Sequence, residues 1–156
     1  MNENLQKMLA LVGEFFDTKN DPDQISVTED ERDKLDAIHP STLSEYSEGN
    51  GPLVWVLVVP TTEDVMNRFL KGEISEKTLL EETLPGIKYD AVYLCSALVL
   101  PEYRRHGFAK KITVDAINEI RKDHKITALF YWQFSKEGAA LAEAIAKEVQ
   151  LPLYKR

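Results

Sequence analysis

Residues 98–111, Leu-Val-Leu-Pro-Glu-Tyr-Arg-Arg-His-Gly-Phe-Ala-Lys-Lys, join an apolar strand to an amphipathic helix through a short basic loop. The helix begins at about Phe108, and a helix start offers unbonded backbone N–H groups and the positive end of the helix dipole. Gly107 lets the main chain approach an anion closely, and Arg104 and Arg105 add positive charge beside it. The stretch therefore predicts a strand-loop-helix unit that binds phosphate groups.

The loop resembles motif A of the GNAT superfamily of N-acetyltransferases, which reads Gln/Arg-x-x-Gly-x-Gly/Ala. This chain has Arg104-Arg105-His106-Gly107-Phe108-Ala109, after a strand that ends in Val99-Leu100-Pro101-Glu102-Tyr103. The resemblance is best over residues 91–134 and extends in outline from residue 53 onward. The first third departs from the family pattern, because a helix comes first and one clear strand, not an antiparallel pair, precedes residue 61.

The resemblance implies that acetyl-CoA, as co-substrate, lies across an opening between the strands at 91–100 and 126–134. Main-chain groups of Ala97, Leu98 and Val99 would pair with its pantetheine arm, and an amide near Leu98 would stabilise the oxyanion. An amine acceptor would attack the thioester carbonyl directly, with no metal. The residues that would hold the diphosphate are those of the loop and the first helical turn: Arg104, Arg105, His106, Gly107, Phe108, Ala109 and Lys110.

The proton-transfer residues of the family are matched only in part. Where some members carry a glutamate base, this chain has Tyr93, which would either order a catalytic water or pack in the core. The family's thiolate-protonating tyrosine would fall near Ala142, in a helix that contains no tyrosine. Tyr131 and Tyr154 are the remaining candidates for that role.

Other reactive or aromatic residues have simpler interpretations. Cys95 lies in an apolar strand and is expected to be a small buried residue instead of a nucleophile. His106 is expected to face solvent or phosphate, and Trp55 and Trp132 to lie in the core. The three histidines and one cysteine have no metal-ligand spacing, so no zinc site is predicted.

The composition indicates one intracellular domain. A chain of 156 residues is long enough to bury a substantial core, and a single cysteine permits no intramolecular disulfide. Its start lacks the features of a signal peptide, and no apolar run reaches membrane-spanning length. We therefore expect a cytoplasmic protein with no membrane partner.

The net charge of −7 is distributed unevenly along the chain. Residues 1–90 contain 19 acidic and 8 basic side chains, whereas residues 91–156 contain 7 acidic and 11 basic ones. The acidic part would attract a cationic amine, or it would serve only solubility. Nucleic-acid binding is disfavoured, because the basic residues form no long stripe. Whether the chain forms a homodimer is left open.

Hydrophobic periodicity predicts the elements that surround the loop. In the first third it indicates a helix over 4–17 that buries Leu5, Met8, Leu9, Val12 and Phe16. A short strand at most over 24–27, a capped helix over 28–38 and an exposed loop over 39–52 follow. From there the expected strands are 53–59, 91–100, 126–134 and 151–154, and the expected helices are two short ones within 61–84, then 108–123 and 136–149.

This alternation predicts one domain over residues 1–156 with a GNAT-like three-layer α/β sandwich around a mixed, partly antiparallel sheet. The expected function is transfer of an acetyl group from acetyl-CoA to an amine. One alternative is a non-catalytic acyl-CoA-binding module, which the missing helix tyrosine favours. The other is an unrelated phosphate-binding α/β domain that uses the same kind of loop.

Overall fold

The computed structural model describes residues 3–19 and 29–156, with side chains placed for residues 3–11 and 32–156. Helices and strands alternate along most of this chain. In order, the elements are α1 (Glu3–Lys19), α2 (Glu29–Ile38), β1 (Leu43–Glu48), β2 (Gly51–Thr61), α3 (Glu63–Leu70), α4 (Glu76–Glu82), β3 (Ala91–Val99), the 3-10 turn η1 (Pro101–Tyr103), α5 (Phe108–Asp123), β4 (Ala128–Tyr131), α6 (Lys136–Val149) and β5 (Leu153–Lys155).

The described strands form one mixed sheet in the order β1-β2-β3-β4-β5. The β1–β2 and β2–β3 pairs are antiparallel, and the β3–β4 and β4–β5 pairs are parallel. Helix α5 connects β3 to β4, and helix α6 connects β4 to β5. Each parallel pair thus has the helical crossover that parallel pairing requires.

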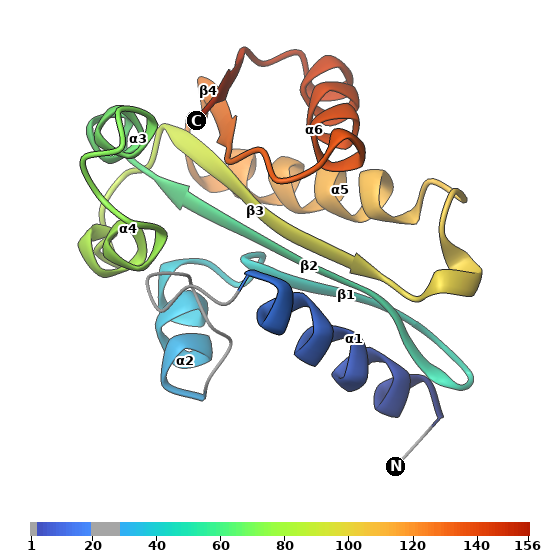
Figure 1. Ribbon diagram of the computed structural model, residues 1–156. Coiled ribbons are helices and arrows are strands. Elements are labelled where there is room, and N and C mark those ends of the chain that lie inside the picture. The colour runs from blue at the N-terminus through green and yellow to red at the C-terminus, as the bar shows by residue number, and fades with distance from the viewer. Residues whose placement is uncertain (1–2, 20–28) are drawn as a thin grey trace.

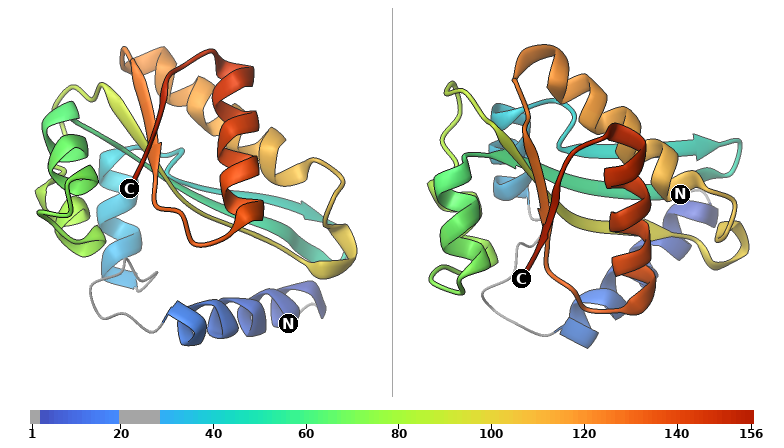
Figure 2. Two further views of the ribbon diagram at one scale, coloured as in Figure 1. Left: turned by 45° about the horizontal axis from the view of Figure 1, so that its top comes forward. Right: turned by 90° about the horizontal axis from the view of Figure 1, so that it is seen from above.

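Helices cover both faces of the sheet. Helices α5 and α6 lie on one face and α1 and α2 on the other, while α3 and α4 stand at the end of the sheet where β2 finishes (Figure 1). The turned views in Figure 2 show α1 on the side away from α5 and α6. This arrangement is a three-layer α/β sandwich, so the predicted fold class is confirmed.

The core forms where apolar residues of the sheet meet the helices. Strand β2 is buried along almost its whole length, as its continuous apolar run predicts for a strand covered on both faces. In α5, Ile117 and Ile120 are completely buried, which is the face that helical periodicity indicates. In α6, Ile145 and Val149 are buried in the same way.

The predicted exposed loop over residues 39–52 is wrong, because β1 lies within it. Strand β1 pairs with β2 from Leu43↔Leu57 to Glu48↔Gly51. Its sequence, Leu-Ser-Glu-Tyr-Ser-Glu, has too few apolar residues to indicate a strand, and backbone pairing at the sheet edge holds it in place. Two antiparallel strands therefore precede residue 61.

Three smaller predictions need comment. Strand β4 ends at Tyr131 instead of extending to Phe134, and the chain leaves the sheet there. Leu9 is 47% exposed, whereas Met8 beside it is fully buried. The expected strand over 24–27 and the side chains of Val12 and Phe16 lie outside the described residues.

Within the described part of the chain, no helix has the length and apolar character needed to cross a membrane.

Candidate functional site

Strands β3 and β4 separate part-way along β3. They pair only from Ala91↔Ala128 to Leu94↔Tyr131, although β3 continues to Val99. Beyond Tyr131 the chain turns away toward α6, so one edge of β3 has no neighbouring strand after Leu94. We call this gap the β3–β4 opening. Its unpaired edge offers N–H and C=O groups to an extended ligand.

A β-bulge at Cys95 marks the start of the opening. The register on β2 passes from Val58↔Leu94 to Leu57↔Ser96, so that Cys95 is the extra residue on β3. A bulge of this kind bends the strand and re-aims its backbone groups. The two strands therefore diverge at the position where the backbone of β3 changes direction.

The pairing also determines which amides face the opening. The Leu100 amide donates to the Leu53 carbonyl at 3.0 Å, and alternate residues of an antiparallel strand face the same neighbour. The Leu98 amide therefore faces β2, whereas Ala97 and Val99 face the opening. Leu98 is thus wrongly oriented for the predicted oxyanion role, and the Ala97 amide is the donor on the correct side.

A cavity of about 290 Å³ occupies the opening. Its walls come from the middle of β2, the diverging part of β3, the segment after β4, and facing residues of α5 and α6. The residues that line it are Val56, Leu57, Val58, Leu94, Cys95, Ser96, Ala97, Thr113, Tyr131, Trp132, Phe134, Ser135, Glu137, Gly138, Leu141, Ala142 and Ile145.

The cavity lies close to the start of α5. Its lining residue Thr113 donates a hydrogen bond from Oγ1 to the Ala109 carbonyl, one turn earlier, at 2.7 Å. At a rise of 1.5 Å per residue, Thr113 is about 7.5 Å along the axis from Phe108, the first helical residue. The cavity therefore lies within about two helical turns of the end of the basic loop.

Residues 104–110, which we call the 104–110 turn, have a backbone suited to an anion. Arg105 and Gly107 have positive φ values of 66° and 78°, on either side of His106. Turns with positive φ values can direct successive N–H groups into one concavity, which is a common arrangement at anion sites. The Lys111 amide makes the first helical hydrogen bond, to the Gly107 carbonyl at 3.0 Å, so the preceding first-turn amides have no carbonyl within the helix.

The start of α5 also differs from the other helix starts that the structure describes in full. Helices α3, α4 and α6 begin with a side-chain cap from Thr62, Ser75 and Ser135, and each has an acidic residue in its first turn. Helix α5 has Gly107 as its cap, no acidic residue in its first turn, and two lysines there. Cations at this end of a helix are unfavourable unless an anion is bound.

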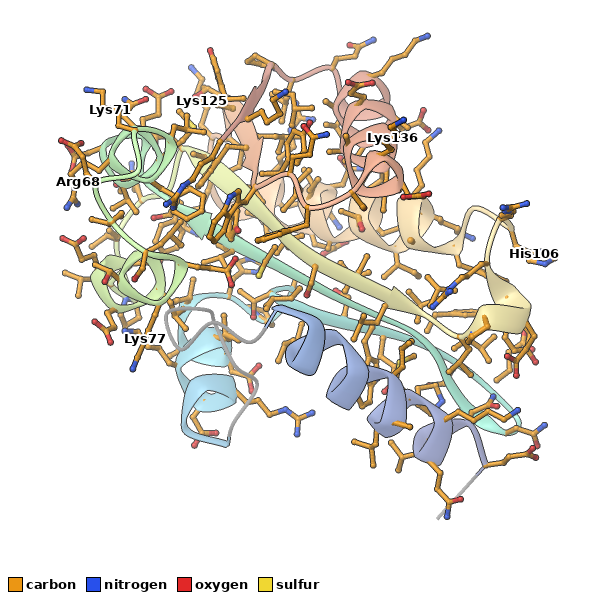
Figure 3. The ribbon with its side chains drawn as sticks, in the orientation of Figure 1. Arg68, Lys71, Lys77, His106, Lys125 and Lys136 are labelled. Carbon is orange, nitrogen blue, oxygen red and sulfur yellow. The ribbon has the colours of Figure 1, made fainter. Side chains whose placement is uncertain are left out.

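Side chains of the 104–110 turn mostly point away from its amides. Phe108 stacks on Tyr46 of β1 at 5.1 Å between ring centres, and the Arg104 Nε donates to the Val99 carbonyl at 3.1 Å. Lys110 is 3.9 Å from the Glu148 carboxylate. Figure 3 shows His106 at the outer tip of the loop. An anion held here would therefore contact main chain more than side chains.

Tyr93 is placed in the core and does not line the cavity. Its side chain is 1% exposed, packs against Phe69 and Phe130, and donates its hydroxyl hydrogen to Glu76 Oε2 at 2.5 Å. Burial, with smaller effects from Cys95 and Glu76, raises the pKa of Tyr93 well above its ordinary value. These contacts favour the packing role over the water-ordering one.

Tyr131 is the predicted catalytic side chain that does line the cavity. It is 6% exposed, and burial, with a smaller effect from the Glu143 carboxylate, raises the pKa of its hydroxyl. Tyr154 is 46% exposed on β5 and is absent from the cavity lining. Ala142 lines the cavity, so the position of the expected helix tyrosine borders the site without a phenol.

Several lining residues have no counterpart in the sequence-based prediction. Thr113 comes from α5, and Trp132, Phe134 and Glu137 follow β4. The last three could have been anticipated, because ligand sites in α/β sheets lie beyond the carboxyl ends of parallel strands. Thr113 gives no such signal, since its place depends on how α5 packs.

The described residues contain no group of three or more His, Cys, Asp or Glu side chains placed to hold a metal ion. The candidate site consists of a turn with positive φ values at a helix start, an open strand edge and a largely apolar cavity. Comparison of the chain with protein-family models, curated proteins and solved structures finds no match.

Proposed function

We propose that this chain is an N-acetyltransferase of the GNAT type, which moves an acetyl group from acetyl-CoA to an amine. The observation that carries the proposal is the continuity of the 104–110 turn with the β3–β4 opening. A turn with two positive φ values lies at one end of an unpaired strand edge, and a largely apolar cavity lies at the other. CoA has the matching order of groups: a diphosphate, an amide-containing arm and a thiol.

The length of the free edge of β3 supports this orientation of CoA. The five steps from Val99 back to Leu94 span about 17 Å of extended strand. An arm that pairs with the free edge of β3 would run from the 104–110 turn toward the bulge at Cys95. The Val99 amide faces the opening beside the turn and is suited to pair with this arm, and the Ala97 amide lies further along, where the thioester would stand.

The proposed reaction is direct transfer within a complex of protein, acetyl-CoA and amine. The neutral amine attacks the thioester carbonyl carbon, and the Ala97 amide stabilises the negative oxygen that forms. Collapse of this intermediate breaks the C–S bond and releases the CoA thiolate. The amine nitrogen loses one proton to water, and the thiolate takes one from Tyr131, which burial keeps protonated at neutral pH. Tyr131 then regains a proton from solvent, which balances the proton released by the amine. The products are an amide and CoA.

Two further observations support the proposal. The antiparallel pair β1–β2 supplies the early strand pair of the GNAT pattern, although a helix and not a strand comes first in this chain. The single cysteine suits a reducing compartment, so we place the activity in the cytoplasm.

A specific observation favours a second candidate function, a non-catalytic acyl-CoA-binding module. Ala142 borders the cavity where the family's proton-donating tyrosine is expected, so the site has one phenol fewer than the pattern requires. Amine-dependent release of the CoA thiol from acetyl-CoA separates the two functions. Release above the buffer rate supports the enzyme, whereas acetyl-CoA binding without release supports the binding module.

The donor site is tested by calorimetric titration of CoA into wild type, Gly107→Val and Arg105→Glu. A side chain at Gly107 would occupy space that the phosphates need, and Arg105→Glu places a negative charge beside them. We expect each variant to bind CoA at least roughly tenfold more weakly, or about 1.4 kcal/mol. A Cβ at Gly107 has no protein atom within 4 Å, so the fold itself has room for it.

Matched controls separate binding from backbone strain and net charge. Gly86 has a φ of 80° and equally open surroundings, so Gly86→Val introduces similar strain far from the 104–110 turn. Lys77→Glu reverses a charge at the opposite end of the sheet from His106 (Figure 3). Both controls should bind CoA like wild type. A wild-type protein with no measurable CoA affinity, or a folded Gly107→Val variant with unchanged affinity, would contradict the proposal.

A further inference from the structure

The mouth of the cavity combines two aromatic rings with one carboxylate. Trp132 and Phe134 follow β4 and lie 4.7 Å apart between ring centres, and Glu137 is in the first turn of α6. All three side chains line the cavity, and Glu137 is the one charged residue among the lining residues that the structure describes. We call these three residues the aromatic–acidic mouth.

These side chains are accessible to a ligand. Phe134 is 52% exposed, which is unusual for a large apolar residue that borders a cavity, and Glu137 is exposed as well. Exposed aromatic surface beside a concave site is a common feature of ligand binding. The neighbouring Lys136 is turned by about 100° around the helix from Glu137, so the two side chains leave α6 in different directions.

A cation of the protein itself, Arg156, occupies one face of the Trp132 ring, so a ligand cation would bind at the exposed Phe134 ring beside it. The guanidinium carbon of Arg156 lies 4.4 Å from the centre of the Trp132 ring and 4.5 Å from that of Phe69. Cations bind aromatic faces through the ring quadrupole, and a nearby carboxylate adds a charge of the correct sign. An acyl tail would be a poor occupant of the same place, because it would remove the Glu137 carboxylate from water without pairing it.

We infer that the aromatic–acidic mouth binds the acceptor of the reaction, and that this acceptor is an amine with a second, cationic group, which the mouth holds while the neutral amino group attacks. That the bound amine is the acceptor rests on the proposed function. Binding of a cation at the mouth can be tested without any transfer reaction. Tyr131, the last residue of β4, also lines the cavity and stands directly before Trp132. An amine held at the mouth is therefore next to the place where the thioester would lie.

The test is titration of 1,4-diaminobutane into the protein, with and without saturating CoA, followed by calorimetry and tryptophan fluorescence. The uncharged 1,4-butanediol is the matched ligand control. We expect the diamine to bind at least roughly tenfold more tightly than the diol. Added salt should weaken binding of the diamine but not binding of the diol. Glu137→Gln and Phe134→Leu should each weaken diamine binding about threefold. The double variant should weaken it by about tenfold.

The controls distinguish cation binding at the mouth from CoA binding at the donor site. Glu81→Gln removes an exposed charge outside the cavity and should leave diamine binding unchanged. Equal binding of diamine and diol, or a folded double variant that binds diamine like wild type, overturns the inference and leaves the CoA result standing. Loss of CoA binding in wild type would instead remove the proposed function.

Discussion

At the scale of single residues, the contact between Tyr93 and Glu76 has the clearest consequence. Both side chains are buried, and the Tyr93 hydroxyl donates to the Glu76 carboxylate at 2.5 Å. Tyr93→Phe would remove that donor and leave a buried carboxylate oxygen less well satisfied. We expect the free energy of unfolding to fall by about 1–3 kcal/mol in urea denaturation.

The same variant separates packing from catalysis. If Tyr93 serves the core, Tyr93→Phe should change the turnover of amine acetylation less than about twofold at a temperature where the variant is folded. A drop of about tenfold or more with unchanged CoA affinity would instead restore the water-ordering role. Tyr131→Phe is the comparison, because its side chain lines the cavity and its loss should lower turnover.

At the scale of elements, helix α5 begins with a glycine cap and without an acidic residue in its first turn, a start that a bound anion would stabilise. Lys111 stands in its first turn, where a cation opposes the helix dipole. Lys111→Glu should therefore stabilise the ligand-free protein by about 0.3–1 kcal/mol while weakening CoA binding. Urea denaturation and calorimetry of the same variant measure both effects, and a variant that loses stability would contradict this interpretation of α5.

The elements also show which parts of the fold and of the candidate site could be predicted from the sequence. Gly107 and the basic residues around it indicated the strand-loop-helix unit, because backbone conformation and charge there are local properties. Strand β1 was missed because its partner, not its own sequence, holds it at the sheet edge. The bulge at Cys95 could not be predicted from the sequence either, because it exists only as a shift in the pairing register between β2 and β3. The hydrogen bond from Leu100 to Leu53 of β2 makes Ala97, not Leu98, the candidate oxyanion donor, and the sequence did not indicate this pairing.

At the scale of the whole molecule, a histidine cluster joins three parts of the chain that are distant in sequence. His39 follows α2, Asp123 and His124 end α5, and Tyr89 precedes β3. His39 Nε2 lies 2.8 Å from Asp123 Oδ2, and His39 Nδ1 accepts from the Ser41 amide. No spacing in the sequence indicates this cluster, because the fold alone brings its members together.

The cluster predicts how stability depends on pH. His124 Nδ1 accepts a hydrogen bond from the Tyr89 amide at 3.3 Å, which requires the unprotonated nitrogen. Burial, and then the nearby His39, lowers the pKa of His124 below its ordinary value of 6.5. The unfolded chain therefore takes up this proton more readily than the folded one. The stabilisation is complete above about pH 6.5 and is lost as the pH falls from there toward the lower folded pKa.

Urea denaturation between pH 5 and 8 measures this dependence. The slope from His124 cannot exceed about 1.4 kcal/mol per pH unit, which corresponds to one proton. His124→Asn retains a side-chain acceptor for the Tyr89 amide but does not titrate, so its stability should fall less steeply below pH 6.5 than that of wild type. Identical slopes for the two proteins would mean that His124 is not the group responsible, and that the junction between α5 and β3 does not respond to acid through this residue.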